Sequence, residues 1–151
     1  MERQIERDLL EEALQANEAA SGPVPQSLRD EAAELFRRVK QRVTAFVREA
    51  QDNDFRVVVS AMTPIEAQDI RVKSDRLRWY LSRLKIEPVT EDISSRAIEL
   101  LRDARLHGHK YAIDAVVAAT ALRSVRPAIV LTSDEDDMSK LCGKAVQVVP
   151  V

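Results

Sequence analysis

The chain has 151 residues with a formal net charge of −2, and 45% of its residues are hydrophobic while 32% are charged. This length and apolar fraction are typical of one domain folded around one core. The near-neutral charge excludes a general attraction to nucleic acid, so RNA binding would need a local basic patch or a bound cation. Cys142 is the only cysteine, which excludes an internal disulfide and a cysteine-based zinc site. No apolar run reaches the roughly 18 residues of a membrane span, and Met1 leads into charged residues rather than a signal peptide. We therefore expect a cytoplasmic protein without a membrane segment.

The first part of the chain, residues 1–53, predicts two helices. Apolar residues recur at helical spacing over residues 2–20, and the SGPVP stretch ends this pattern. Ser27 is placed to cap a second helix that runs to about Gln51. Whether the first helix packs on a partner chain or on this domain stays open.

From residue 54 onward, β-branched runs alternate with helical patterns. The segment FRVVVS is almost continuously apolar, which is typical of a strand buried on both faces of a parallel sheet. The expected strands cover residues 55–60, 86–89, 128–131 and 145–149. The expected helices open at Thr63 and Pro64, follow through a basic stretch to residue 84, and then cover residues 93–104, 111–123 and 135–141. This alternation predicts an α/β domain over residues 54–151, with a parallel sheet flanked by helices.

Three acidic residues from distant segments are expected at one edge of this sheet. In open α/β sheets, ligands bind beyond the carboxyl ends of the strands. Glu66 lies in the first turn of the helix after the first strand, and Asp134 follows the strand at 128–131. Asp114 lies in the first turn of a helix that must run back antiparallel to the next strand, so it reaches the same edge. Asp137, one turn after Asp134, could reach the same place.

Clustered carboxylates raise one another's pKa, and a divalent cation removes that conflict. Ligands that are all oxygen suit Mg²⁺ or Mn²⁺. Such a metal can lower the pKa of a bound water and neutralise a phosphate oxygen. The pattern therefore predicts metal-assisted hydrolysis of a phosphodiester.

Each acid also has a purely structural interpretation. Glu66 could form a capping box with Thr63, and Asp134 could simply cap the helix that begins at residue 135. Asp137 could be a solvated surface acid. Asp114 stands among small apolar residues in AIDAVVAATA, where a carboxylate is costly unless it is paired or bound to metal.

The segments HKYAIDAVVAATAL and IVLTSDEDDM resemble the C-terminal half of PIN domains, and RVVVSAMTPIEAQDI resembles the second strand and following helix of that family. The resemblance implies a three-layer α/β domain over residues 54–151, preceded by the N-terminal helices. By this resemblance, Glu66, Asp114 and Asp134 correspond to three metal ligands of the family, and Asp137 matches a fourth, more variable position. Thr132 and Ser133 match the polar residues that flank the acidic turn.

The resemblance also implies an activity and partners. The family's activity is Mg²⁺-dependent cleavage of RNA with water as the nucleophile, and the nearest pattern is that of ribonuclease toxins from toxin–antitoxin pairs. An RNA substrate, an antitoxin protein and a homodimer are therefore expected.

One family feature is not found in the first 54 residues. PIN domains begin with an apolar strand that ends in an aspartate and lies at the centre of the sheet. Either this strand precedes Met1, or the domain has lost it. Without it, the remaining strands are expected to divide into two half-sheets with unpaired backbone groups. One alternative function is thus a catalytically impaired PIN-derived module that binds RNA or protein. Another is an unrelated α/β domain whose acids are caps and ion-pair partners.

Two further clusters have open interpretations. Arg71, Lys73, Arg76 and Arg78 form a basic stretch that could bind RNA phosphates or could be a solvated helix face. Thr132 and Ser133 are further expected RNA-binding residues. Trp79 and Tyr80 could stack on bases, or they could fill a core or a dimer contact.

Overall fold

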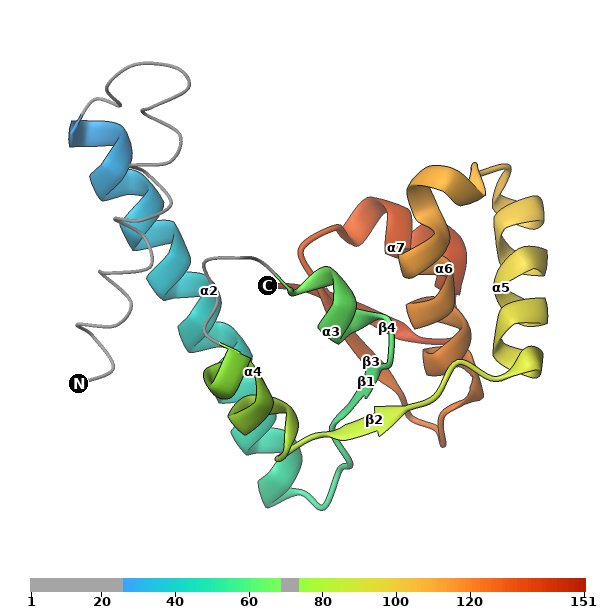
Figure 1. Ribbon diagram of the computed structural model, residues 1–151, viewed down its shortest axis with the longest axis horizontal. Helices are drawn as coiled ribbons and strands as arrows, with labels where there is room; N and C mark the ends of the chain where they lie inside the picture. Colours follow the sequence, from blue (N-terminus) through green and yellow to red (C-terminus); the bar gives the residue numbers. More distant parts are fainter. Residues whose placement is uncertain (1–25, 69–73) are drawn as a thin grey trace.

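The computed structural model describes residues 26–68 and 74–151, so the helix expected at residues 2–20 lies outside the described residues. The elements in chain order are α2 (Gln26–Asp52), β1 (Val58–Ser60), α3 (Thr63–Glu66), α4 (Ser74–Leu81), β2 (Lys85–Glu87), α5 (Glu91–Ala104), α6 (Gly108–Arg123), β3 (Ile129–Thr132), α7 (Glu135–Cys142) and β4 (Gln147–Pro150). Strands and helices alternate from β1 onward, which confirms the predicted α/β class (Figure 1).

The strands form two parallel pairs rather than one sheet. Strand β1 pairs with β2, with Val58 opposite Lys85, and β3 pairs with β4, with Ile129 opposite Gln147. Within the described ranges, no ladder joins one pair to the other. The predicted parallel direction of the strands is confirmed, but the described strands form two pairs and not the single sheet that was expected.

The core lies where α5, α6 and α7 pack together with β3 and β4 (Figure 1). Its buried hydrophobic residues are Ile93, Ala97, Leu100, Ala115, Ala118, Ala119, Val130, Met138, Leu141, Cys142 and Val146. Thr90 caps α5 by accepting a hydrogen bond from the Ile93 amide at 3.3 Å. The three alanines of α6 let its neighbours approach closely, so α6 is held at the centre of this helical layer.

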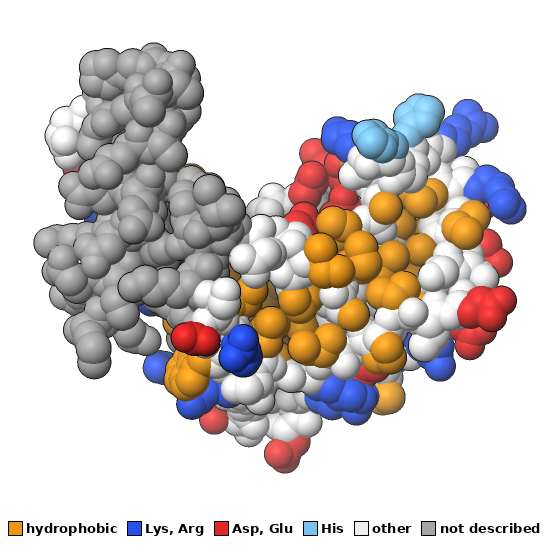
Figure 2. Space-filling view, viewed as in Figure 1, with side chains coloured by type: hydrophobic (Ala, Val, Ile, Leu, Met, Phe, Trp, Pro, Cys, Tyr) orange, Lys and Arg blue, Asp and Glu red, His pale blue; other side chains and the backbone are white. Residues whose placement is uncertain are grey.

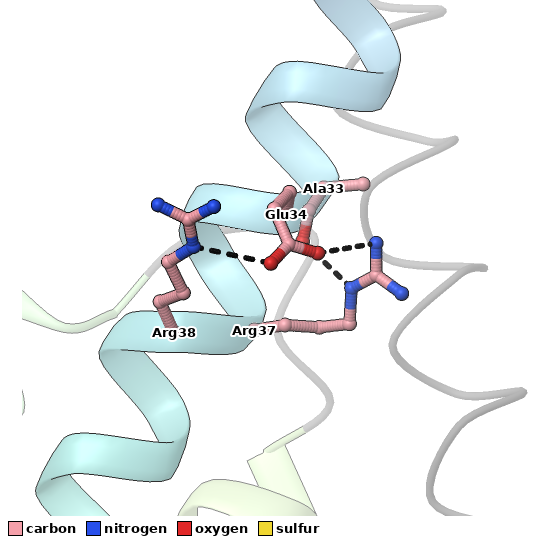
Figure 3. Close-up of polar contacts among 4 residues, drawn as sticks. All are labelled: Ala33, Glu34, Arg37 and Arg38. Carbon is pink, nitrogen blue, oxygen red and sulfur yellow. Dashed lines mark hydrogen bonds and ion pairs between the residues drawn. The ribbon is translucent and has the colours of Figure 1, made fainter.

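Helix α2 confirms the helix expected over residues 27–51, although Ser27 lies inside it after Gln26 rather than before it. In Figure 1 it runs on the opposite side of the strands from α5. Its charged surface carries ion pairs from Glu34 to Arg37 at 2.9 Å and to Arg38 at 3.1 Å (Figure 3). These pairs are exposed, so they add little to stability. No helix in the described part of the chain is both long and apolar enough to span a bilayer.

Candidate metal centre

Asp114 occupies the point where several elements meet. It lies on α6, which begins at Gly108, one turn earlier than the predicted start at residue 111. The helix is kinked at Tyr111, where φ is −110° and ψ is 15°. Helix α6 contacts α3, β1, β3 and α7. Asp114 is half-buried as a result.

The charge on Asp114 is disfavoured by its surroundings. Burial raises the pKa of Asp114 most, and the negative charges of Glu66, Asp134 and Asp137 raise that pKa further. Lys110 opposes this effect. The charges of the other three predicted acids therefore act on Asp114, and they disfavour its charged form.

Glu66 is the last residue of α3 and is exposed. The turn before this helix is fixed by Ser60, which is buried at the end of β1 and accepts a hydrogen bond from the Met62 amide at 3.2 Å. The prediction that Thr63 is the N-cap is wrong, because Thr63 is already helical and Met62 precedes it without a side-chain cap. The capping-box interpretation of Glu66 fails with it. Among the described side chains, Glu66 has no hydrogen-bond or ion-pair partner.

Asp134 is the N-cap of α7. Its Oδ1 accepts a hydrogen bond from the Asp137 amide at 3.2 Å, so the helix-cap interpretation is confirmed. The Thr132 hydroxyl in turn accepts from the Asp134 amide at 3.0 Å, while Ser133 between them is exposed. The first hydrogen bond orients the Asp134 side chain and the second fixes its backbone, and a cap can still offer its second oxygen to a ligand.

Asp137 is paired rather than solvated. Its side chain is 14% exposed and forms an ion pair with Lys140 at 2.9 Å, so the interpretation as a solvated surface acid is wrong. The hydrogen bond from Lys140 holds the pKa of Asp137 below its usual value. The negative charge of Asp137 in turn raises the pKa of Asp114.

Sequence reasoning missed two lysines at this centre. Lys110 donates a hydrogen bond to the Tyr111 hydroxyl at 2.9 Å, which raises the pKa of Lys110, and Asp137 and Asp134 raise that pKa further. Lys140 pairs with Asp137 as described above. The signal was the spacing: Lys110 precedes Asp114 by four residues and Lys140 follows Asp137 by three, the separations at which helical side chains meet.

The donor set fits a hard divalent cation in its chemistry, since all four candidate ligands are carboxylates. The fit is not complete in its arrangement. In the described part of the chain, no group of three or more Asp, Glu, His or Cys side chains is close enough to hold a metal ion. The acids affect the pKa of Asp114, but the described side chains do not form a coordination sphere. Their role as metal ligands therefore stays a prediction.

The predicted RNA-binding residues are only partly described. Arg71 and Lys73 lie outside the described residues, and of Arg76 only the backbone, within α4, is described. Their role also stays a prediction.

Comparison with known proteins identifies the family. The model of the PIN domain matches residues 40–144, which is more than half of the chain. The match includes β1, α6 and the acidic turn before α7, and it begins inside α2. No curated protein and no solved structure matches the chain significantly. The hypothesis of an unrelated α/β domain is therefore wrong. PIN domains are a nuclease family whose members generally use divalent metals. On this match, and on the α/β fold that carries it, the chain belongs to the PIN-domain family.

Proposed function

We propose that the protein is a metal-dependent endoribonuclease that hydrolyses RNA phosphodiesters with a metal-activated water. The observation that carries this proposal is Asp114, a half-buried carboxylate whose pKa is raised by burial and by three further acids. Such a cluster is unfavourable when all its members are charged, and a divalent cation makes it favourable.

In this proposal Asp114, Glu66 and Asp134 hold Mg²⁺ or Mn²⁺, with Asp137 beside them. When bound, the ion supplies a water of lowered pKa and neutralises charge on the phosphate. Asp134 is already oriented by its two hydrogen bonds in the turn before α7. Lys110 places a cation in the field of Asp134 and Asp137, where it can also pair with a substrate phosphate.

The wider setting is part of the same proposal. Residues 54–151 form the catalytic unit, and residues 1–53 form a helical segment that precedes it. The protein acts in the cytoplasm as a homodimer and serves as the toxin of a toxin–antitoxin pair. The family match at residues 40–144 supports the nuclease part of this proposal.

The test is RNA cleavage by the purified full chain in EDTA and in Mn²⁺, with two variants. Asp114→Asn removes the central charge, and Asp103→Asn makes the same chemical change at an exposed position on α5. We expect Mn²⁺-dependent cleavage by the parent and by Asp103→Asn, and a loss of at least about 100-fold in Asp114→Asn. Cleavage that ignores Mn²⁺ and is equal in all three proteins would overturn the proposal.

A second function, RNA or protein binding without catalysis, is favoured by the arrangement of the acids. No three of the described Asp, Glu, His and Cys side chains are close enough to share an ion. Coding DNA upstream of the Met1 codon separates the two functions. An in-frame strand that ends in aspartate would favour the nuclease, and an in-frame stop would favour the binding module.

A further inference from the structure

An exposed aromatic pair lies at the end of α4. Trp79 and Tyr80 meet edge to face, with ring centroids 5.0 Å apart and an interplanar angle of 84°. Trp79 is 51% exposed and Tyr80 is 41% exposed, so the interpretation that they fill the core is wrong. Aromatic rings of this size lose favourable burial when they stay in water, so a pair held at the surface points to a ligand.

A guanidinium group is stacked on this pair. The Arg83 Cζ atom lies 3.7 Å from the centroid of the Trp79 ring. The end of the helix brings it there, because the Arg83 amide bonds to the Tyr80 carbonyl at 3.1 Å and the Ser82 hydroxyl bonds to the Trp79 carbonyl at 2.7 Å. The Trp79 ring and the positive charge of Arg83 are thereby held together, with the Tyr80 ring almost perpendicular to Trp79.

The charges around this surface decide what it can bind. Arg83 forms no ion pair with a described acid, and Arg78 is only loosely paired with Asp75 at 3.7 Å. Both partners of that pair are almost fully in solvent, so Arg78 can turn to a phosphate at little cost. Aromatic rings interleaved with arginines are the composition of sites that bind single-stranded nucleic acid.

We propose that Trp79, Tyr80 and Arg83 form a binding site for single-stranded nucleic acid. An unpaired base stacks on the free part of the Trp79–Arg83 surface, and an arginine pairs with the adjoining phosphate. The site needs no metal and no cleavage, so it does not depend on the proposed nuclease activity. Its arginine and aromatic rings attract nucleic acid locally, whereas the net charge of −2 gives the whole chain no such attraction.

The direct test uses the fluorescence of Trp79, the only tryptophan in the chain. The full chain is titrated in EDTA with a single-stranded RNA of about ten nucleotides, the corresponding DNA, and the same sequence as a duplex. We expect both single strands to quench the fluorescence saturably and the duplex to leave it unchanged. A preference of RNA over DNA would show that the 2′-hydroxyl is also read. Absence of saturable quenching by either single strand, or equal quenching by the duplex, would refute the site.

Variants confirm where the strand binds, with affinity measured as the anisotropy of a labelled strand. Trp79→Ala should weaken binding about five- to 100-fold, while Trp79→Phe should keep most of it, because base stacking needs only an aromatic face. Arg83→Ala should also weaken binding and reduce the slope of log affinity against log salt by about 0.7. The matched controls on α5, Ile98→Ala and Arg102→Ala, remove an exposed apolar side chain and an exposed arginine, and should change nothing.

Trp79→Phe keeps the test valid if Trp79→Ala does not fold, because loss of RNA binding in folded Trp79→Phe would exclude simple stacking. Full affinity in folded Trp79→Ala would overturn the proposal. So would a variant that dissociates a dimer in sedimentation but still binds RNA, since that result assigns the aromatic pair to a contact between copies. Cleavage by the parent and Asp114→Asn is scored separately, so failure of one proposal is distinguishable from failure of the other.

Discussion

Replacement of Asp114 by asparagine should stabilise the metal-free protein. The pKa of Asp114 is raised above its ordinary value of 3.8 in the folded state, so the folded state binds this proton more tightly than the unfolded state. The resulting stabilisation is present below the ordinary pKa and is lost as pH rises through the folded pKa. At pH 7 the charged carboxylate of Asp114 therefore lowers the free energy of unfolding. Asparagine keeps the shape of the aspartate side chain and removes its charge.

The expected sizes follow from the partial burial of Asp114 and from metal linkage. A half-buried acid is screened by solvent, so the gain in EDTA should be about 0.5–1 kcal/mol. That corresponds to a rise in Tm of about 1–4 °C for a domain of this length. Mn²⁺ at about 100 times its Kd should stabilise the parent by about 2.7 kcal/mol, which is about 5–11 °C. Asp114→Asn should lose most of that shift, so the order of stability reverses between EDTA and Mn²⁺.

The assay is thermal unfolding followed by circular dichroism at pH 4 and pH 7, each with EDTA and with Mn²⁺. The advantage of Asp114→Asn in EDTA should shrink at pH 4, where Asp114 of the parent takes up a proton. Asp103→Asn should match the parent throughout. A variant that is less stable than the parent in EDTA at both pH values would show that Asp114 is held by structural pairing, and would refute the reasoning from charge.

Three more predictions test other parts of the centre and its support. Asp134→Ala should lower the Tm by about 2–4 °C because α7 loses its N-cap, whereas Asp134→Asn should keep the cap and still weaken the Mn²⁺ shift; equal Tm values for the two variants would argue against the cap. Lys140→Met should raise the pKa of Asp137 towards its ordinary value, because the hydrogen bond that lowers it is gone, and a carboxyl NMR titration that shows no rise would contradict this. Ala118→Leu, at a fully buried position of α6, should cost about 1–3 kcal/mol in urea unfolding by overpacking the contact between α5 and α6, while the exposed Ile98→Ala should cost much less.

The helices could be predicted from sequence because their signals are local. The signals for helix α5, its Thr90 cap and its apolar spacing, lie within the segment itself, and the helix covers Glu91–Ala104 where residues 93–104 were predicted. The strands were less predictable. The apolar run at residues 55–60 yields only Val58–Ser60 as strand, because strand length depends on the partner, and β2 has just three residues. Local propensity does not carry that information.

For the candidate site, the positions of the acids along the chain could be predicted, but the partners of each carboxylate could not. Positions after strand ends and in first helical turns indicated Glu66, Asp114 and Asp134, and the charges of Glu66 and Asp134 do raise the pKa of Asp114. That the three acids share one ion stays a prediction, because no three of the described acidic side chains are close enough to hold one. The interactions of each carboxylate were less predictable, because they depend on the surrounding fold. Asp137 pairs with Lys140, a partner that was not predicted although it lies only three residues away. The distances between the acids depend on how two sheets and three helices pack.

The separation of the acids has a structural origin in the two half-sheets. Glu66 follows β1 and Asp134 follows β3, and no described hydrogen-bond ladder links these strands. In a parallel strand, alternate residues direct their backbone groups to opposite edges, so half of those in β1 face away from β2. Helix α6 contacts both β1 and β3, and it is therefore the common support that lets Asp114 sense both acids. In the described part of the chain no ladder fixes the spacing of the two pairs, so an ion bound by acids from both pairs would also have to fix that spacing. Part of its binding free energy would be spent on that ordering, so we expect a metal affinity lower than four preorganised carboxylates would give.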